Sequence, residues 1–182
     1  KWGGRELNYA SDIDLVFVHE CDADAAVRAG AVFIDLMAER TTEGFAFRVD
    51  TGLRPEGSAG PLSRTLDSYR AYWKQWARTW EFQALLKARP AAGDPALAAA
   101  FLEASRPFVH PEMLGSEAVR EIRAMKARAE RLVTGPDELK RGIGGIRDVE
   151  FAVQLLQLVH GRADPALRSK YFAPDGSFVN QW

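Results

Sequence analysis

The first part of the chain alternates apolar and polar residues in the pattern that predicts β-strands. Apolar residues stand at positions 13, 15 and 17, and Asp12 and Asp14 belong to the opposite set. Because side chains along a strand point to its two faces in turn, Asp12 and Asp14 are expected on one face. Residues 45–50 alternate in the same way and predict a second strand with Asp50 at its end.

Apolar residues spaced three and four apart predict helices around these strands. The first helix is expected from a cap at Asp22 or Asp24 to about residue 40. Its core-facing stripe would contain Val27, Ala31, Ile34 and Ala38. A second helix is expected at 63–77 and a third at 80–89, and their aromatic stripe is interpreted as core. That stripe contains Leu66, Tyr69, Trp73, Trp76 and Trp80.

The second half of the chain predicts helices alone. An alanine-rich helix is expected at 94–105, followed by a segment, 106–112, whose two prolines predict a linker between domains. An amphipathic, charge-dense helix is expected at 116–133. Glycines at 142–145 introduce a nearly continuous apolar helix at 147–159, which is expected to be buried on most sides.

Composition narrows the classes of function. The 182 residues carry a net charge of −1, and the 27% that are charged are mixed along the chain, which argues against nucleic-acid binding through a broad positive field. Cys21 is the single cysteine, so no internal disulfide can form and the cytoplasm is expected. No apolar run reaches the roughly 20 residues that cross a bilayer, so no membrane association is expected. From the residues at its two ends, the chain is expected to be a fragment of a longer protein.

Asp12, Asp14 and Asp50 are candidate metal ligands. Two carboxylates at the start of an apolar strand repel each other, and a divalent cation is the usual reason for such a pair. If the strand that ends at Asp50 lies beside the first, three carboxylates can hold two Mg²⁺ ions roughly 4 Å apart for in-line displacement at phosphorus. The structural alternative is that these residues serve turns or caps. One cysteine and three histidines cannot form a closed zinc site.

Glycines and cations near these acids are candidate phosphate contacts. Gly3 and Gly4 allow close approach of the backbone to a phosphate, although no Walker sequence follows them. Arg54 follows the second strand and either reaches a phosphate or is a solvated loop residue. Lys87 and Arg89, at the end of a predicted helix, either meet a triphosphate or point to solvent.

Five blocks of sequence point to one family. They are GGRELNYASDIDL at 3–15, VDTGLRPEG at 49–57, GPL at 60–62, TWEFQALLKAR at 79–89 and GGIRDVEF at 144–151. In order and spacing they resemble the glutamine synthetase adenylyltransferase/adenylyl-removing enzymes, two-headed bacterial members of the polymerase-beta-like nucleotidyltransferase superfamily. The resemblance implies an α+β fold: an N-terminally truncated nucleotidyltransferase core with a mixed sheet at 1–106, then a partial all-helical domain at 112–182.

The resemblance also implies site residues. It assigns catalysis and Mg²⁺ binding to Asp12, Asp14 and Asp50. It assigns nucleotide or phosphate contacts to Gly3, Gly4, Ser11, Arg54, Lys87 and Arg89. It supplies no role for Asp148 or Glu150, whose charges suit the first turn of a helix. Gly52 departs from the arginine that many members carry, which removes one phosphate contact.

The function implied is regulation of glutamine synthetase in nitrogen metabolism, with the PII signal protein as a partner and ATP, ADP and phosphate as small molecules. One half of such enzymes attaches AMP to a tyrosine, and the other removes it by phosphorolysis to give ADP. The forms GGIRD at 144–148 and KARP at 87–90 favour the N-terminal, adenylyl-removing half. The alternatives are ATP-dependent adenylylation of the same tyrosine, a catalytically inactive docking module, and a nucleotidyltransferase that acts on a small molecule.

Overall fold

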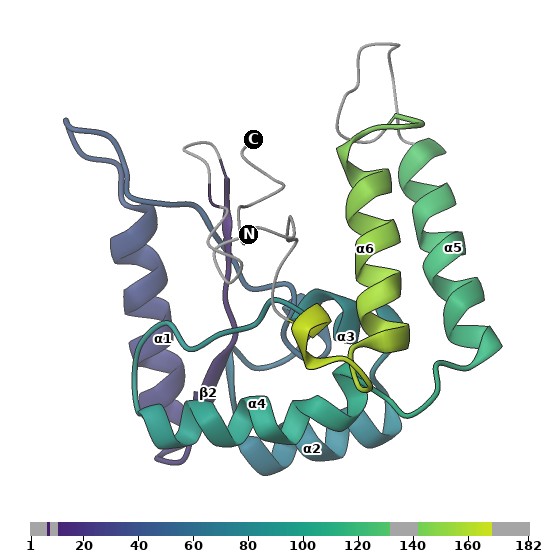
Figure 1. Ribbon diagram of the computed structural model, residues 1–182. Coiled ribbons are helices and arrows are strands. Elements are labelled where there is room, and N and C mark those ends of the chain that lie inside the picture. Colours follow the sequence, from purple (N-terminus) through teal and green to yellow (C-terminus); the bar gives the residue numbers. More distant parts are fainter. Residues whose placement is uncertain (1–6, 8–10, 132–141, 169–182) are drawn as a thin grey trace. The chain divides into compact units, whose positions relative to one another are not determined.

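The computed structural model describes residues 7, 11–131 and 142–168 (Figure 1). The chain divides into two compact units. The first contains the described residues up to Ala77 together with Lys87–Ser105, and the second contains Arg78–Leu86 and the described residues from Arg106 onward. Predictions for Gly3 and Gly4 lie outside the described residues. Helices and short parallel strands make up these units, which is compatible with the expected α+β class.

The predicted first strand pairs with two successive partners. Its start, β1 (Ile13–Asp14), runs parallel to β3 (Val49–Asp50), and its end, β2 (Phe17–His19), runs parallel to β4 (Ser63–Thr65). The expected neighbour relation between the strand at Asp14 and the strand at Asp50 is therefore confirmed. The second strand is shorter than the predicted 45–50, because only its last two residues pair with β1.

Helix α1 (Ala23–Ala38) is close to its predicted range, and Asp22 caps it by accepting a hydrogen bond from the N–H of Ala25 at 2.9 Å. Its inner stripe differs from the expected one, since Ala31 and Ala38 are exposed. The less exposed stripe consists of Val27, Gly30, Ile34 and Met37. A side chain at Gly30 would come within 3.1 Å of Leu62, so the helix approaches its neighbours most closely there.

The predicted helix at 63–77 is wrong at its start, because residues 63–65 form β4. Thr65 then caps α2 (Leu66–Gln75), accepting from the N–H of Ser68 at 3.3 Å. Tyr69 and Trp73 are buried, and each lies edge-on to Phe101, with ring centroids 5.1 and 5.2 Å apart. These residues and Leu66 confirm the expected aromatic core of the first unit. Two members of the predicted stripe, Trp76 and Trp80, are 66% and 40% exposed, because α2 ends before them.

Helix α4 (Pro95–Val109) includes the first four residues of the predicted linker at 106–112, and the division between the two units falls inside this helix, between Ser105 and Arg106. The helix continues through Pro107 although proline lacks the N–H that would bond one turn back. The ladder resumes beyond it, where the N–H of His110 donates to the carbonyl of Arg106 at 2.8 Å.

The second unit is built from α3 (Thr79–Leu85), α5 (Ser116–Arg131), α6 (Ile146–His160) and the short helix η2 (Pro165–Arg168). Helices α5 and α6 lie side by side (Figure 1). The core of this unit contains Leu86, Val109, Ile122 and Leu158. The expected burial of α6 on most sides is wrong in this unit, because Val149 and Leu156 are more than half exposed. No helix in the described ranges is long and apolar enough to cross a membrane.

Candidate active site

The parallel pairing of β1 and β3 brings two of the predicted acids together. In its register Ile13 lies opposite Val49 and Asp14 lies opposite Asp50. The N–H of Ile13 donates to the carbonyl of Arg48 at 2.9 Å, and the N–H of Leu15 donates to the carbonyl of Asp50 at 2.8 Å. Register partners in a sheet share a face, so the carboxyls of Asp14 and Asp50 project on the same side.

The electrostatics of this pair are unfavourable in the absence of a cation. Burial raises the pKa of the Asp14 carboxyl, and the negative charges of Asp50 and Asp12 raise it further. Asp50 Oδ1 accepts a hydrogen bond from the N–H of Gly52 at 2.7 Å. A side chain at Gly52 would come within 3.0 Å of that oxygen, so the glycine allows the backbone to meet the carboxylate. Gly52 therefore contributes a backbone donor at the position where the resemblance anticipates an arginine.

The third acid, Asp12, forms an ion pair with Arg48. The Nε of Arg48 donates to Asp12 Oδ1, and both residues come two positions before Asp14 and Asp50 on their segments. Among the described residues, no group of three or more His, Cys, Asp and Glu side chains is arranged to hold a metal ion. The strands thus bring Asp14 and Asp50 together, whereas Asp12 faces a guanidinium. The signal for Arg48 was present in the sequence, because it shares a strand face with Asp50.

Arg54 is neither solvated nor in contact with these acids. It is half-buried, and its Nη1 donates to the carbonyl and the hydroxyl of Thr51 at 2.8 and 2.5 Å. Its Nε donates to the carbonyl of Gly60 at 3.2 Å. These bonds tie together the two ends of the loop that leaves β3. The structure therefore places Arg54 as an internal brace of the loop that follows Asp50.

Arg64, on β4, is a second arginine that contacts this loop, and sequence reasoning did not single it out. It forms an ion pair with Glu56, and its Nη1 donates to the hydroxyl of Ser68 at 3.1 Å. Glu56 has a φ of 63°, in the left-handed region that non-glycine residues rarely adopt. The backbone of Pro55 passes so close to Gly60 that a Cβ there would lie 2.2 Å from the Pro55 carbonyl oxygen, so this position requires glycine. These contacts together hold the loop in one conformation.

The remaining predicted phosphate contacts have less defined surroundings. Ser11 is half-buried and directly precedes Asp12. Lys87 is half-buried and Arg89 is exposed, in the segment that follows α3. The Nη1 of Arg89 donates to the carbonyl of its neighbour Pro90 at 3.3 Å.

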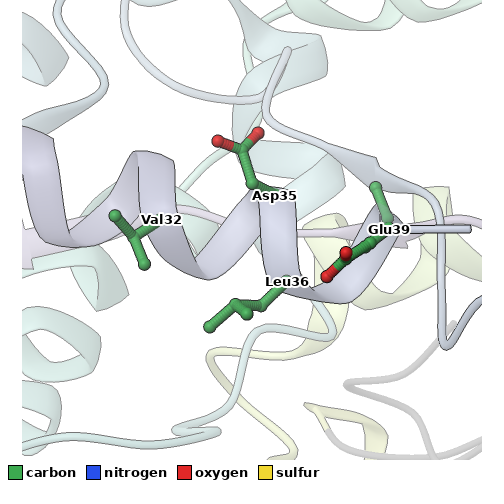
Figure 2. Close-up of a pocket in the computed structure, with 5 residues that line it drawn as sticks. Val32, Asp35, Leu36 and Glu39 are labelled. Atoms are coloured by element: carbon green, nitrogen blue, oxygen red, sulfur yellow. The ribbon is translucent and has the colours of Figure 1, made fainter.

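The first unit also has a shallow hollow, which is lined by a different set of residues. Figure 2 shows that Val32, Asp35 and Leu36 on α1 line it together with Glu39, the residue that caps the end of this helix, and Ala38 completes the set. None of the predicted site residues lines it. We therefore place the candidate site at the acids of β1 and β3.

Asp148, which the sequence left without a role, is a structural residue of the second unit. Its Oδ2 accepts from the N–H of Gly144 at 2.8 Å, and its Oδ1 lies 3.1 Å from Nζ of Lys126 on α5. The Gly144 N–H and the Lys126 ammonium lower the pKa of Asp148. Contacts with Glu130 and Asp148 raise the pKa of Lys126. Asp148 thus links the start of α6 to α5.

Comparison with known proteins identifies the family of the chain. The family model described as Glutamate-ammonia ligase adenylyltransferase matches residues 1–104, more than half of the chain. The chain belongs to this family. A second model, GlnD PII-uridylyltransferase, matches residues 116–175.

Curated relatives carry a name that agrees with this family. The chain is 50% identical to a bifunctional glutamine synthetase adenylyltransferase/adenylyl-removing enzyme of Streptomyces coelicolor, with 93% of the chain and 18% of the relative aligned. It is 51% identical to the protein of the same name from Mycolicibacterium smegmatis, over 92% of the chain and 17% of the relative. A Bifidobacterium longum subsp. infantis protein of that name is 45% identical over 93% of the chain and 17% of its own length. The chain thus spans less than a fifth of these relatives.

Proposed function

We propose that this chain is a nucleotidyltransferase module that regulates glutamine synthetase, with its reaction at the face formed by Asp12, Asp14 and Asp50. The observation that carries the proposal is the register of β1 and β3, which sets Asp14 directly opposite Asp50. Two aligned carboxylates with a raised pKa at Asp14 are an unfavourable arrangement for a purely structural sheet. The family and the names of the relatives support the same reaction class.

Mg²⁺ is the metal that this set of residues would bind. The three aspartates offer only carboxylate oxygens, which hard divalent cations prefer, and a cation would relieve the repulsion that the pKa of Asp14 reports. When bound, the metal supplies positive charge at the reacting phosphorus and its oxygens. In the structure, Oδ1 of Asp12 accepts a hydrogen bond from Arg48.

We assign the direction of the reaction as removal of AMP from a tyrosine. An oxygen of inorganic phosphate attacks the phosphorus of the adenylyl group, the bond from phosphorus to the tyrosine oxygen breaks, and the tyrosine hydroxyl regains a proton as ADP leaves. Lys87 and Arg89, with Gly3, Gly4 and Ser11, are the proposed contacts of the nucleotide and phosphate. Arg54 acts on this site through its loop, since its guanidinium donates to Thr51 and Gly60.

The proposal extends to domains, partners and compartment. Residues 1–106 would form the nucleotidyltransferase core and 112–182 a helical domain, in line with the ranges of the two family models. A PII signal protein is the proposed regulatory partner, because the helical segment is similar to a PII-uridylyltransferase. The cytoplasm is the proposed compartment, since the chain has one cysteine and no means of forming an internal disulfide.

The test measures both directions in parallel. The protein is incubated with adenylylated glutamine synthetase and phosphate, and separately with unadenylylated glutamine synthetase and ATP. We expect ADP in the first reaction, and we expect Asp14→Asn to lower its rate by at least about a hundredfold because preorganised charge stabilisation is lost. Asp67→Asn, which alters an exposed ion pair with Arg70 on α2, is the matched control and should leave the rate unchanged.

The outcomes separate the alternatives. Pyrophosphate from the second reaction, without ADP from the first, would assign the opposite direction. Neither product, together with intact binding to glutamine synthetase, would identify a docking module. Normal turnover by Asp14→Asn would remove the acids of β1 and β3 from the mechanism.

A further inference from the structure

Four charged side chains lie together where strands β1 and β3 pair. Asp14 lies opposite Asp50. Two residues earlier on each segment, just before the strands begin, Asp12 and Arg48 form an ion pair. Like charges directly opposite each other destabilise a sheet, whereas opposite charges stabilise it. Arg48 is therefore a positive charge that is paired directly with one of the three acids, Asp12.

The exposure of this ion pair distinguishes Arg48 from the other arginines near the site. The side chains of Arg48 and Asp12 are 59% and 50% exposed, so the guanidinium can leave the carboxylate without opening the core. Arg64, by contrast, is 17% exposed and bonded to Glu56, and Arg54 is bonded within its own loop. Exposed ion pairs are worth little, about 0–1 kcal/mol, so a divalent cation can displace this one.

We propose that Arg48 is an exchangeable counter-cation of the acid cluster: it occupies Asp12 when no metal is bound and yields Asp12 to the divalent cation when the metal binds. This inference rests on the proposed function, because it assumes that the three acids bind metal. Arg48 acts through Asp12 and is a positioning residue. It stabilises the metal-free sheet and, by the same contact, weakens the affinity of the site for metal.

The alternative is that the Arg48–Asp12 pair is a fixed brace that preorganises Asp12. The two roles predict opposite changes in the affinity for metal when Arg48 is replaced. If the pair is a brace, loss of Arg48 weakens metal binding, because Asp12 is no longer held in place. If the pair exchanges, loss of Arg48 tightens metal binding, because a competing positive charge has been removed.

The experiment titrates Mn²⁺ into the full chain and follows free Mn²⁺ by its electron paramagnetic resonance signal, with Mg²⁺ as competitor. We expect Arg48→Gln to lower the Kd for Mn²⁺ by about tenfold, a conservative value for removing a unit charge beside a divalent ion at a half-exposed site. Arg70→Gln is the matched control, because it breaks the exposed Arg70–Asp67 pair and changes net charge equally. Its Kd should stay within about twofold of the wild-type value.

Thermal unfolding supplies a second readout. Without metal, Arg48→Gln should melt at a lower temperature than the wild type, because the three acids lose their counter-charge. With saturating Mg²⁺ the difference should shrink, since the metal replaces the lost charge. If Arg48→Gln does not fold, Arg48→Lys keeps the charge but loses the donor geometry of the guanidinium, and its Kd should fall by about threefold.

Failure of the inference and failure of the proposed function give different results. An unchanged or raised Kd in the folded Arg48 variants, with saturable wild-type binding that Asp14→Asn abolishes, overturns the exchange and leaves the metal site in place. Absence of saturable Mn²⁺ binding in the wild type overturns the metal site itself, and the exchange with it.

Discussion

Replacement of Arg54 tests whether this residue braces a loop or binds phosphate. The wild-type side chain makes three hydrogen bonds, two from Nη1 to Thr51 and one from Nε to Gly60. Bonds from a charged donor contribute about 1.5–3 kcal/mol each when buried, and half-burial lowers that value. We expect Arg54→Gln to lower the free energy of unfolding by about 2–3 kcal/mol.

Arg54→Lys makes the test specific. Lysine keeps the positive charge but cannot reproduce the fixed fork of the guanidinium, so it should cost about 2 kcal/mol, nearly as much as glutamine. Urea unfolding followed by tryptophan fluorescence gives both values. Arg70→Gln, at an exposed ion pair, should change stability by less than about 1 kcal/mol and serves as the control.

A phosphate ligand would behave differently. In that case Arg54→Lys would have the same urea midpoint as the wild type, and the KM for phosphate would rise in both variants. That combination would refute the brace and restore the role that the resemblance implies. Loss of stability in both variants supports the structural assignment.

Two further changes probe the loop and the second unit. Gly60→Ala should destabilise the chain by at least about 2 kcal/mol in urea unfolding, because the new Cβ would meet the Pro55 carbonyl at 2.2 Å, whereas Gly115→Ala has open space and should not destabilise. The pKa of Asp148 is lowered in the folded state, so its stabilising effect is complete above its unfolded pKa of about 3.9 and is lost as pH falls through the folded pKa. Asp148→Asn should therefore lower the urea midpoint at pH 7, and the loss should be smaller at pH 2.5. Equal losses at both pH values would exclude the charge pairing with Lys126 as the cause.

The local features of the fold were predictable from the sequence. The α1 cap at Asp22 and the ranges of α5 and α6 follow from local spacing and capping chemistry, and the structure agrees with them within a few residues. The period of two along a strand is also local, and it placed Asp12 and Asp14 on one face before any partner was known. The buried aromatic residues Tyr69 and Trp73 follow from helical spacing in the same way.

The prediction from sequence was wrong where a segment's local pattern fits more than one structure. Residues 63–65 fit the start of a helix, but they pair with β2 because the extended segment from Ile13 offers them free backbone groups. Buried Ser63 Oγ lies 2.7 Å from His19 Nδ1, a contact that no local pattern contains. Trp76 fits the helical stripe, yet it is exposed because α2 ends at Gln75.

The chain by itself determined which residue types could meet at the candidate site, because periodicity and motif spacing are properties of a single segment. Only the tertiary structure decided the partners: Asp14 opposite Asp50, Asp12 on Arg48, and Arg54 on its own loop. The physical reason is register. Moving one strand by a single residue would leave every local pattern intact and would set Asp14 opposite Val49 or Thr51 instead of Asp50.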